Sequence, residues 1–421
     1  MTGASRVSEP GTTGTGTSGL RAVVFQVPAA VLFVNLALAG NNALVAIVLY
    51  RLTGSASHFA LVLVSNFAIA AVVQLIAGHV VDRFGARRLA VLSEGLACAA
   101  ITVEAAVSLL DSPAVPLVCG AALVSVIQGF YRASMFTLSP QLVGKERLAA
   151  LNARINAAFQ AGTLLGAPLG TVLLLLPPVW GFLTLAVSFA AAALILGMLP
   201  KPPRPSARSS GPEPAKTGLL RELRGQRGLI THILLCSGDY VAVYLFTLVV
   251  VPLVDGRFGG NTMTLAVVNA ALPAGIMLSG LVQWRSWSGE RTRRLVTGFM
   301  AMTVSVFLLL MIDLGQVATV VCVVAIGFAA GSSQTLLMTA LQLRSPTHIL
   351  GRVASLRLFV ASALAAPTLA SASYLLGDGV RTAMFYCAAV EAVALAALLI
   401  LSHRRLLGRS TLSAAPDTPV E

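Results

Sequence analysis

The chain is a succession of long apolar segments separated by short charged loops. Phe59 to Ala77 and Leu89 to Leu110, for example, flank a charged turn at residues 78–88. At ~1.5 Å of rise per residue, a helix over either segment is long enough to cross a ~30 Å hydrocarbon layer. Because 57% of the 421 residues are apolar and only 11% are charged, most of the chain is predicted to lie in a membrane.

Turn residues and charges divide the chain into twelve predicted helical spans in two sets of six. The first set is 23–50, 57–80, 89–110, 114–137, 149–176 and 179–199, and the second is 229–253, 263–284, 295–313, 316–341, 352–377 and 381–402. The predicted organisation is a disordered tail at 1–20, a six-helix bundle at 21–200, a linker at 201–228, a second bundle at 229–403 and a tail at 404–421. The linker is Pro-rich and basic, and the first tail is rich in Gly, Thr and Ser.

Lysine and arginine are concentrated in alternate loops. They occur in the turn at 78–88, the loop at 140–147, the linker and the loops at 285–294 and 344–352, whereas the intervening loops hold only Arg51, Arg257 and Arg381. Since positive residues in short loops are retained in the cytoplasm, we predict a multi-pass protein of the bacterial plasma (inner) membrane with both termini in the cytoplasm. The formal net charge of +13 is then a topology signal, and nucleic acid is not an expected partner.

The two halves also resemble each other. The segment from Pro140 to Leu151 has a counterpart from Pro346 to Leu356, and Gly78 before its charged loop has a counterpart in Gly280. Duplicated six-helix halves are typical of alternating-access carriers, in which the substrate site lies near the membrane midplane between the repeats.

The charged turn carries a motif. It resembles the G-x-x-x-D-R-x-G-R-[RK] loop between the second and third helices of the major facilitator superfamily, although Ala86 replaces the usual first arginine. Residues 49–56 and the Pro140 loop resemble a bacterial exporter branch that includes macrolide-efflux and siderophore-export carriers. The resemblance covers nearly all of residues 21–403 and implies an all-α membrane protein with twelve transmembrane helices in two pseudo-symmetric six-helix bundles. The motif residues are Gly78, Asp82, Arg83, Gly85, Arg87 and Arg88.

We interpret this motif as a breakable cytoplasmic gate. Its glycines permit close backbone approach and a tight turn, and Asp82 is suited to cap the start of a neighbouring helix. The resemblance implies that the partner of Asp82 lies near Gly351 and Arg352, at the start of the eleventh helix. In the alternative interpretation, the arginines are topology signals only.

The fifth span contains a second motif. It is similar to a Gly/Pro-rich pattern of drug/proton antiporters, with Ala167 where a glycine is usual, and it favours export. Ordinary packing glycines are the alternative. The residues are Gly162, Gly166, Pro168 and Gly170.

Ionisable residues inside the spans are costly in lipid and are therefore functional candidates. Arg132 lies in the fourth span and Asp239 in the seventh. The resemblance implies that the first, fourth, seventh and tenth helices line a central cavity, so these two residues would face each other. Asp239 is the candidate proton carrier, and a static ion pair is the alternative. The residues of the candidate substrate or proton pathway are Asp239, Arg132, Gln128, Tyr131, Tyr240, Tyr244, Asn35 and Asn42.

The other membrane carboxylates are expected to be peripheral or are left open. We expect Glu94 to stay near the cytoplasmic surface and pair with a loop arginine, whereas Glu104 and Glu391 are not assigned. The five cysteines have no paired spacing and are expected to be free, buried thiols. The histidines have no metal-ligand spacing and no Walker-type loop is present, so neither a metal nor another cofactor is expected.

We therefore expect a secondary active transporter that exports a hydrophobic or amphipathic, drug-like small molecule, with proton antiport and alternating access. The alternative is export of a siderophore or an endogenous secondary metabolite, whose acidic group Arg132 would attract. From another class, a lysolipid flippase or a transport-inactive sensor stays open. An enzyme is not expected, because no Ser/His/Asp or His/Glu group occurs in the loops. The expected partners are the substrate, protons and membrane lipid, and we expect a monomer.

Overall fold

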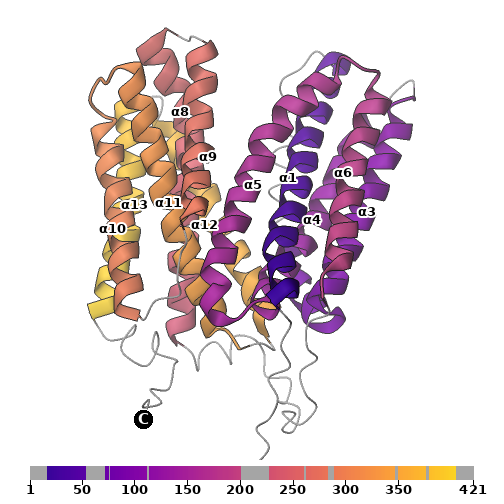
Figure 1. The fold of residues 1–421 in the computed structure, drawn as a ribbon. Helices are drawn as coiled ribbons and strands as arrows, with labels where there is room; N and C mark the ends of the chain where they lie inside the picture. Colours follow the sequence, from indigo (N-terminus) through magenta and orange to yellow (C-terminus); the bar gives the residue numbers. More distant parts are fainter. Residues whose placement is uncertain are drawn as a thin grey trace, which may run out of the picture.

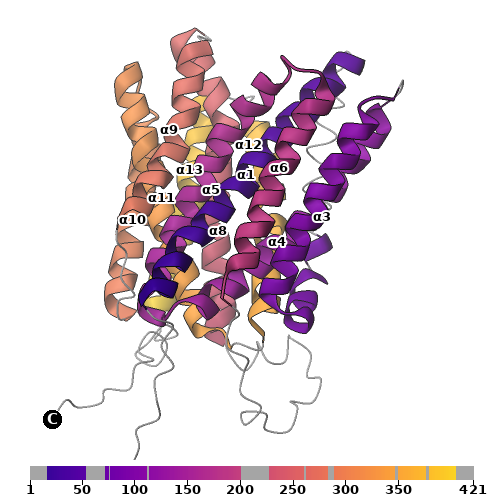
Figure 2. The ribbon, with the colours of Figure 1, turned by 45° about the vertical axis from the view of Figure 1, so that its right-hand side comes forward.

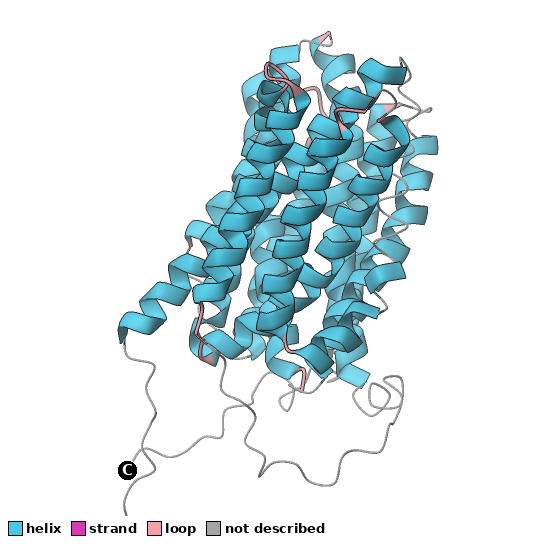
Figure 3. Cartoon of the chain, turned by 90° about the vertical axis from the view of Figure 1, so that its right-hand side faces the viewer, coloured by secondary structure: helices cyan, strands magenta, loops and turns pink. Residues whose placement is uncertain are grey.

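The computed structural model describes residues 17–53, 72–74, 76–110, 113–200, 227–259, 262–282, 289–346, 349–375 and 379–403. Every regular element within these ranges is a helix (Figure 3). The predicted second span falls partly outside them, at 54–71, and so do most of the predicted tails and linker. The predicted domain boundaries therefore stay predictions.

Eleven long helices and a helical segment at 76–84 make up the described part, which agrees with two sets of six spans. In the first half they are α1 (Thr17–Thr53), α3 (Ala86–Val107), α4 (Ala114–Leu142), α5 (Lys145–Leu173) and α6 (Pro178–Met198). In the second half they are α8 (Arg227–Phe258), α9 (Thr262–Leu281), α10 (Gly289–Leu309), α11 (Gln316–Arg344), α12 (Leu350–Leu375) and α13 (Val380–His403). Eight of these helices are long and apolar enough to cross a membrane.

The helices form two bundles (Figure 1). We call one end of the molecule the linker end, because α6 ends there at Met198 and α8 begins there at Arg227. The ribbons of the two bundles lie close together at this end and diverge toward the opposite end (Figure 1). In the first bundle, α5 lies alongside α1 in both views (Figure 2).

Each bundle has a hydrophobic core of its own. The core of the first contains Phe182 and Phe189 from α6, and the core of the second contains Phe246 and Phe307, all almost fully buried. A third buried cluster, which we call the shared core, joins Phe136 and Ala149 of the first bundle to residues of the second. Its members lie mainly at the start of α5, α8 and α12 and at the end of α11, so the bundles share buried apolar surface at the linker end.

One helix boundary differs from the sequence prediction. Pro140 was expected to open a loop, but α4 continues through it to Leu142 and α5 begins at Lys145. A proline in the last turn removes one helical hydrogen bond, the one from its own nitrogen to the carbonyl of Phe136. That carbonyl receives a different donor, described below, so the helix does not have to end.

Candidate functional site: the contacts between the two bundles

The charged turn after segment 76–84 is very short, because Gly85 alone separates that segment from α3. Gly85 has a φ of 88°, a conformation that side chains other than glycine rarely adopt. Its N–H donates to the carbonyl oxygen of Val81 (2.9 Å), and its own carbonyl accepts from the N–H of Leu89 (3.1 Å). The turn therefore ends one helix and begins the next without a loop.

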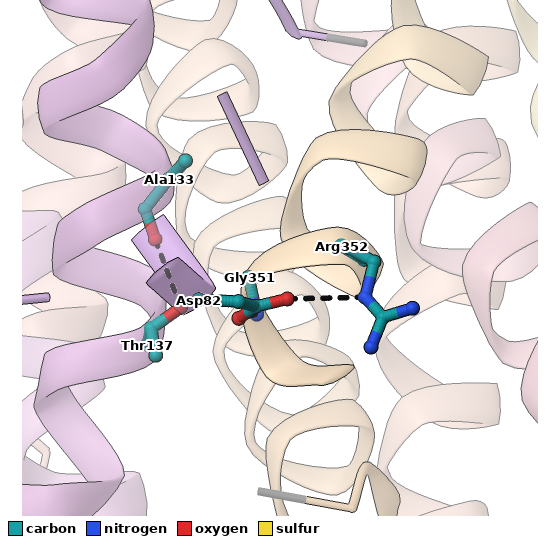
Figure 4. Close-up of polar contacts among 5 residues, drawn as sticks. All are labelled: Asp82, Ala133, Thr137, Gly351 and Arg352. Carbon is teal, nitrogen blue, oxygen red and sulfur yellow. Dashed lines mark hydrogen bonds and ion pairs between the residues drawn. The ribbon is translucent and has the colours of Figure 1, made fainter. Parts of the chain in front are cut away.

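Asp82 lies at the N-terminus of α12, in the other bundle (Figure 4). Its Oδ1 accepts a hydrogen bond from the backbone N–H of Gly351 (3.1 Å), and its Oδ2 accepts one from Nε of Arg352 (3.2 Å). The first N–H groups of a helix have no partner within the helix, and they favour a negative charge. Burial raises the pKa of Asp82, while Arg352 and the Gly351 N–H act against that rise. The contact expected from the sequence is present, and its gating role stays a prediction.

The helices meet here at glycines because nothing larger fits. A Cβ on Gly78 would lie 2.6 Å from the carbonyl oxygen of Gly351. The counterpart of Gly78 in the second bundle, Gly280 of α9, packs against α5: a Cβ on it would lie 2.4 Å from Cβ of Ala157 and 2.7 Å from the oxygen of Ala153. The repeated glycine thus marks the crossing of the two bundles on both sides of the pseudo-twofold axis.

The motif arginines have separate roles. Arg87 donates to the carbonyl oxygen of Gly197 and so links the start of α3 to the end of α6 within the first bundle. Arg83 is exposed and its guanidinium lies over the ring of Phe84 (5.7 Å), and Arg88 is also exposed. Among the motif residues and contacts that the structure describes, Asp82 and Gly78 are the ones at the contact between the bundles.

A buried amide network that the sequence analysis missed joins the bundles beside the motif contact. Nδ2 of Asn152 in α5 donates to Oγ1 of Thr339 (2.9 Å) and to Oε1 of Gln342 (2.6 Å), both in α11. Nε2 of Gln342 donates to the carbonyl oxygen of Phe136 (2.9 Å). This carbonyl is the one that Pro140 leaves without a helical donor. Gln342 stands four residues before Pro346, just as Phe136 stands four residues before Pro140. This equivalent position in the two repeated segments is the sequence signal that could have pointed to a contact between Gln342 and Phe136.

The Gly/Pro-rich motif of α5 packs within the first bundle. A Cβ on Gly162, Gly166 or Gly170 would lie 2.6, 2.3 or 2.3 Å from the carbonyl oxygens of Leu32, Leu36 and Gly40 of α1, respectively. Pro168 lies on an exposed part of the same helix. The glycines therefore set the spacing of α1 and α5, and their proposed link to export stays a prediction.

The predicted pathway residues are only partly described. Gln128 and Tyr131 of α4 are buried and Arg132 is half-buried, whereas Asn42 of α1 is exposed. Nδ2 of Asn35 donates to the carbonyl oxygen of Val31 in its own helix (2.7 Å). The backbone at Asp239, Tyr240 and Tyr244 is part of α8, but their side chains lie outside the described part. The predicted coupling of Arg132 with Asp239 is therefore untested.

The prediction for Glu94 was wrong. Its side chain is fully buried in α3, and Oε1 accepts a hydrogen bond from Nε2 of Gln128 (3.3 Å) rather than from a loop arginine. The reason is the helical repeat. Glu94 lies six residues after Arg88 in α3, and at this position the side chain faces α4 rather than the loop. Glu104 is also buried, against Gly120 of α4, and Glu391 of α13 is fully buried.

One other sequence prediction needs correction, and two buried residues need to be added. All five cysteines are free as expected, but Cys119 is exposed and Cys98 is half-buried rather than buried. His232 is buried near the start of α8, with Nδ1 at 2.6 Å from Nη1 of Arg344, the last residue of α11. Arg357, which the sequence analysis did not consider, is buried in α12, where its carbonyl accepts from Oγ of Ser237 (3.3 Å).

Residues 29–370 match the family model of the Major Facilitator Superfamily. The chain belongs to this superfamily. The Enterobactin exporter EntS of Salmonella choleraesuis (strain SC-B67) is 23% identical to it over 293 residues, which are 66% of this chain and 67% of the exporter. Members of the superfamily are transporters.

Two solved structures share the fold. A bacterial homologue of the iron transporter ferroportin in an outward-facing state superimposes with a TM-score of 0.67 at 16% identity, over 90% of this chain and 100% of its own. The human organic anion transporter MFSD10 (TETRAN) superimposes with a TM-score of 0.68 at 18% identity, over 90% of this chain and 99% of its own. At these identities the likeness establishes the fold and not the substrate.

Proposed function

We propose that the protein is a secondary active exporter of a hydrophobic or amphipathic small molecule, driven by proton antiport, in the plasma membrane of a bacterium. The observation that carries this proposal is where the described contacts between the bundles lie. The Asp82 contact, the paired glycines, the amide network and the shared core are all at the linker end. Breaking contacts at one end is what an alternating-access carrier needs in order to open there.

In this proposal the linker end faces the cytoplasm, as the distribution of lysine and arginine predicts. The structure then corresponds to a state that is closed toward the cytoplasm. Arg132 of α4 contributes to the substrate site, and Asp239 of α8 is a candidate proton carrier because the fourth and seventh helices are among those expected to line the central cavity.

A second candidate is export of an acidic compound, such as a siderophore or another endogenous secondary metabolite. Arg132 favours it, because a half-buried guanidinium in lipid attracts an anionic group. The relative that exports enterobactin is in keeping with this candidate. The charge of the transported substrate distinguishes the two candidate functions.

The test is flux through proteoliposomes that contain the purified full-length protein. The probes are ethidium as a cation, chloramphenicol as a neutral compound and fluorescein as an anion, each with and without an imposed pH gradient. Gradient-dependent movement of ethidium or chloramphenicol supports the first candidate, and movement of fluorescein alone supports the second. If no probe moves in either condition, the transporter proposal loses its support in favour of a lysolipid flippase or a transport-inactive sensor.

A further inference from the structure

The structure places the carboxyl group of Glu94 in the buried interior of the first bundle. Glu94 lies near the middle of α3, with no measurable exposure, and Gln128, its hydrogen-bond partner, lies in the middle of α4. Both positions are about half-way along helices that are long enough to span the membrane. Sequence reasoning had placed Glu94 at the surface, so this site comes from the tertiary structure.

The hydrogen bonds around Glu94 fit the neutral acid. Oε1 accepts from Nε2 of Gln128, while Oε2 is buried without a hydrogen-bond partner among the described residues. The hydroxyl of Tyr131, three residues after Gln128 on the same face of α4, is likewise buried without a partner in the described part of the chain. A carboxylate charge in such surroundings is costly unless a cation compensates it.

Within the described ranges, the charges around Glu94 do not supply that compensation. α3 packs against α4 and α6. The sequence of α6 contains no titratable residue, and α4 offers Tyr131 and Arg132 near this level, with Cys119 more than two turns away. No ion pair within 4.0 Å is seen for Glu94 among the described residues, and its contact is the neutral amide of Gln128.

We infer that Glu94 is a proton-binding site of this transporter. In the described state Oε2 carries the proton and Oε1 accepts from Gln128. When the bundles change from the state closed at the linker end to the state open there, water reaches the half-buried face of α4 at Arg132. The proton then leaves Oε2 for this water at the linker end. It is replaced from water on the other side after the return step, so one proton is carried and no bond other than O–H is broken or made. This inference rests on the proposed antiport for its role in transport, but not for the protonation itself.

Infrared spectroscopy tests the protonation without any substrate. Spectra of the purified full-length protein and of Glu94→Gln are compared at neutral pH. We expect the C=O stretch of a protonated carboxylic acid in the wild type that the variant lacks. The amide I band of the same samples shows whether the variant keeps its helical fold. If the difference spectrum shows carboxylate bands instead of the acid band, Glu94 is ionised and the inference is overturned.

Transport tests the coupling, with the probe that the wild type moves among ethidium, chloramphenicol and fluorescein. We expect Glu94→Gln to lose the acceleration by a pH gradient. Glu104→Gln, which neutralises another buried carboxylate of the same helix, should keep it. Retained acceleration in Glu94→Gln, or equal loss in both variants, overturns the assignment. If the wild type moves no probe, the proposed function has failed, and the infrared spectra still decide whether Glu94 holds a proton.

Discussion

At the scale of single residues, the contact between the bundles depends on one carboxylate and on the absence of two side chains. Asp82 accepts from a backbone N–H at the start of α12 and from Arg352, and Gly78 and Gly351 allow the helices to approach closely enough for these bonds. A Cβ on Gly351 would lie 2.5 Å from Oδ1 of Asp82. The two glycines and the aspartate are therefore needed together, which gives a physical reason for the spacing of Gly78 and Asp82 within the motif.

Asp82→Asn should open the linker end more often. The amide still accepts from Gly351, but the ion pair with Arg352 is lost. Because both side chains are partly exposed (17% and 21%), we expect a shift of about 1 kcal/mol, or about fivefold in the population of the open form. The measurement is the rate of N-ethylmaleimide labelling of a cysteine introduced by Ala149→Cys, a buried position of the shared core, in a cysteine-free background. Glu146→Gln, an exposed acid at the same end, is the matched control and should label at the wild-type rate.

At the scale of elements, two kinds of helix contact hold the molecule together. Within the first bundle, α5 and α1 approach through glycines spaced four residues apart, as small residues allow in membrane helices. Between the bundles, α5 and α4 meet α11 through hydrogen bonds from Nδ2 of Asn152 to Gln342 and from Nε2 of Gln342 to the carbonyl of Phe136. The first contact is close packing, and the second consists of hydrogen bonds that water could replace if the bundles separate, as the proposed function requires.

Gly166→Ala should destabilise the first bundle. The new Cβ would lie 2.3 Å from the carbonyl oxygen of Leu36, so α1 and α5 must move apart. Overpacking of this kind costs about 1–3 kcal/mol. We expect a lower midpoint of thermal unfolding in detergent. Gly95→Ala in α3, where the Cβ meets nothing within 4 Å, is the control, and an equal loss there would argue against the packing explanation.

The amide network should behave as a coupled pair. Asn152→Leu leaves Oε1 of Gln342 buried without its donor, at a cost of about 1–3 kcal/mol to the closed form, and Gln342→Leu costs a similar amount. The double variant should cost less than the sum of the two, because neither side-chain amide is left buried without its partner and the Phe136 carbonyl loses its donor only once. Labelling of the Ala149→Cys reporter measures all three. Strictly additive effects would show that the two amides act independently.

At the scale of the whole molecule, the buried cores are divided between the two bundles and the contact between them. Each bundle has its own core, and the core that they share lies at the linker end. Two rigid bodies can move relative to each other without repacking their own interiors. In the proposed transport cycle, each bundle would keep its own core, and the contacts at the linker end, the shared core included, would break when that end opens.

A reversible cross-link at the linker end should arrest transport. Asn152 and Thr339 are in hydrogen-bond contact across the bundles, so Asn152→Cys together with Thr339→Cys should form a disulfide in a cysteine-free background. We expect oxidation to abolish flux of the transported probe and a reducing agent to restore it, while each single variant is insensitive to oxidation. Full flux through the oxidised double variant would rule out opening at the linker end.

Much of the fold and part of the site could be predicted from the sequence. The long apolar helices and the two halves follow from local hydrophobicity and internal similarity, and the family resemblance of a contiguous motif implied the contact of Asp82 with Gly351 and Arg352. The environment of Glu94 and the partner of Gln342 did not follow. Both depend on the rotation of one helix against another, and Gln342 contacts a carbonyl 206 residues away.

By itself, the sequence determined that this chain forms two sets of membrane helices, because the length of an apolar segment is a local property. It also determined the glycine turn between segment 76–84 and α3, because the conformational freedom of Gly85 belongs to that residue alone. Only the tertiary structure decided which faces of these helices meet. It buried Glu94 beside Gln128 and gave the carbonyl freed by Pro140 a donor from α11. A buried polar group takes the partner that packing provides, and that partner comes from another part of the chain.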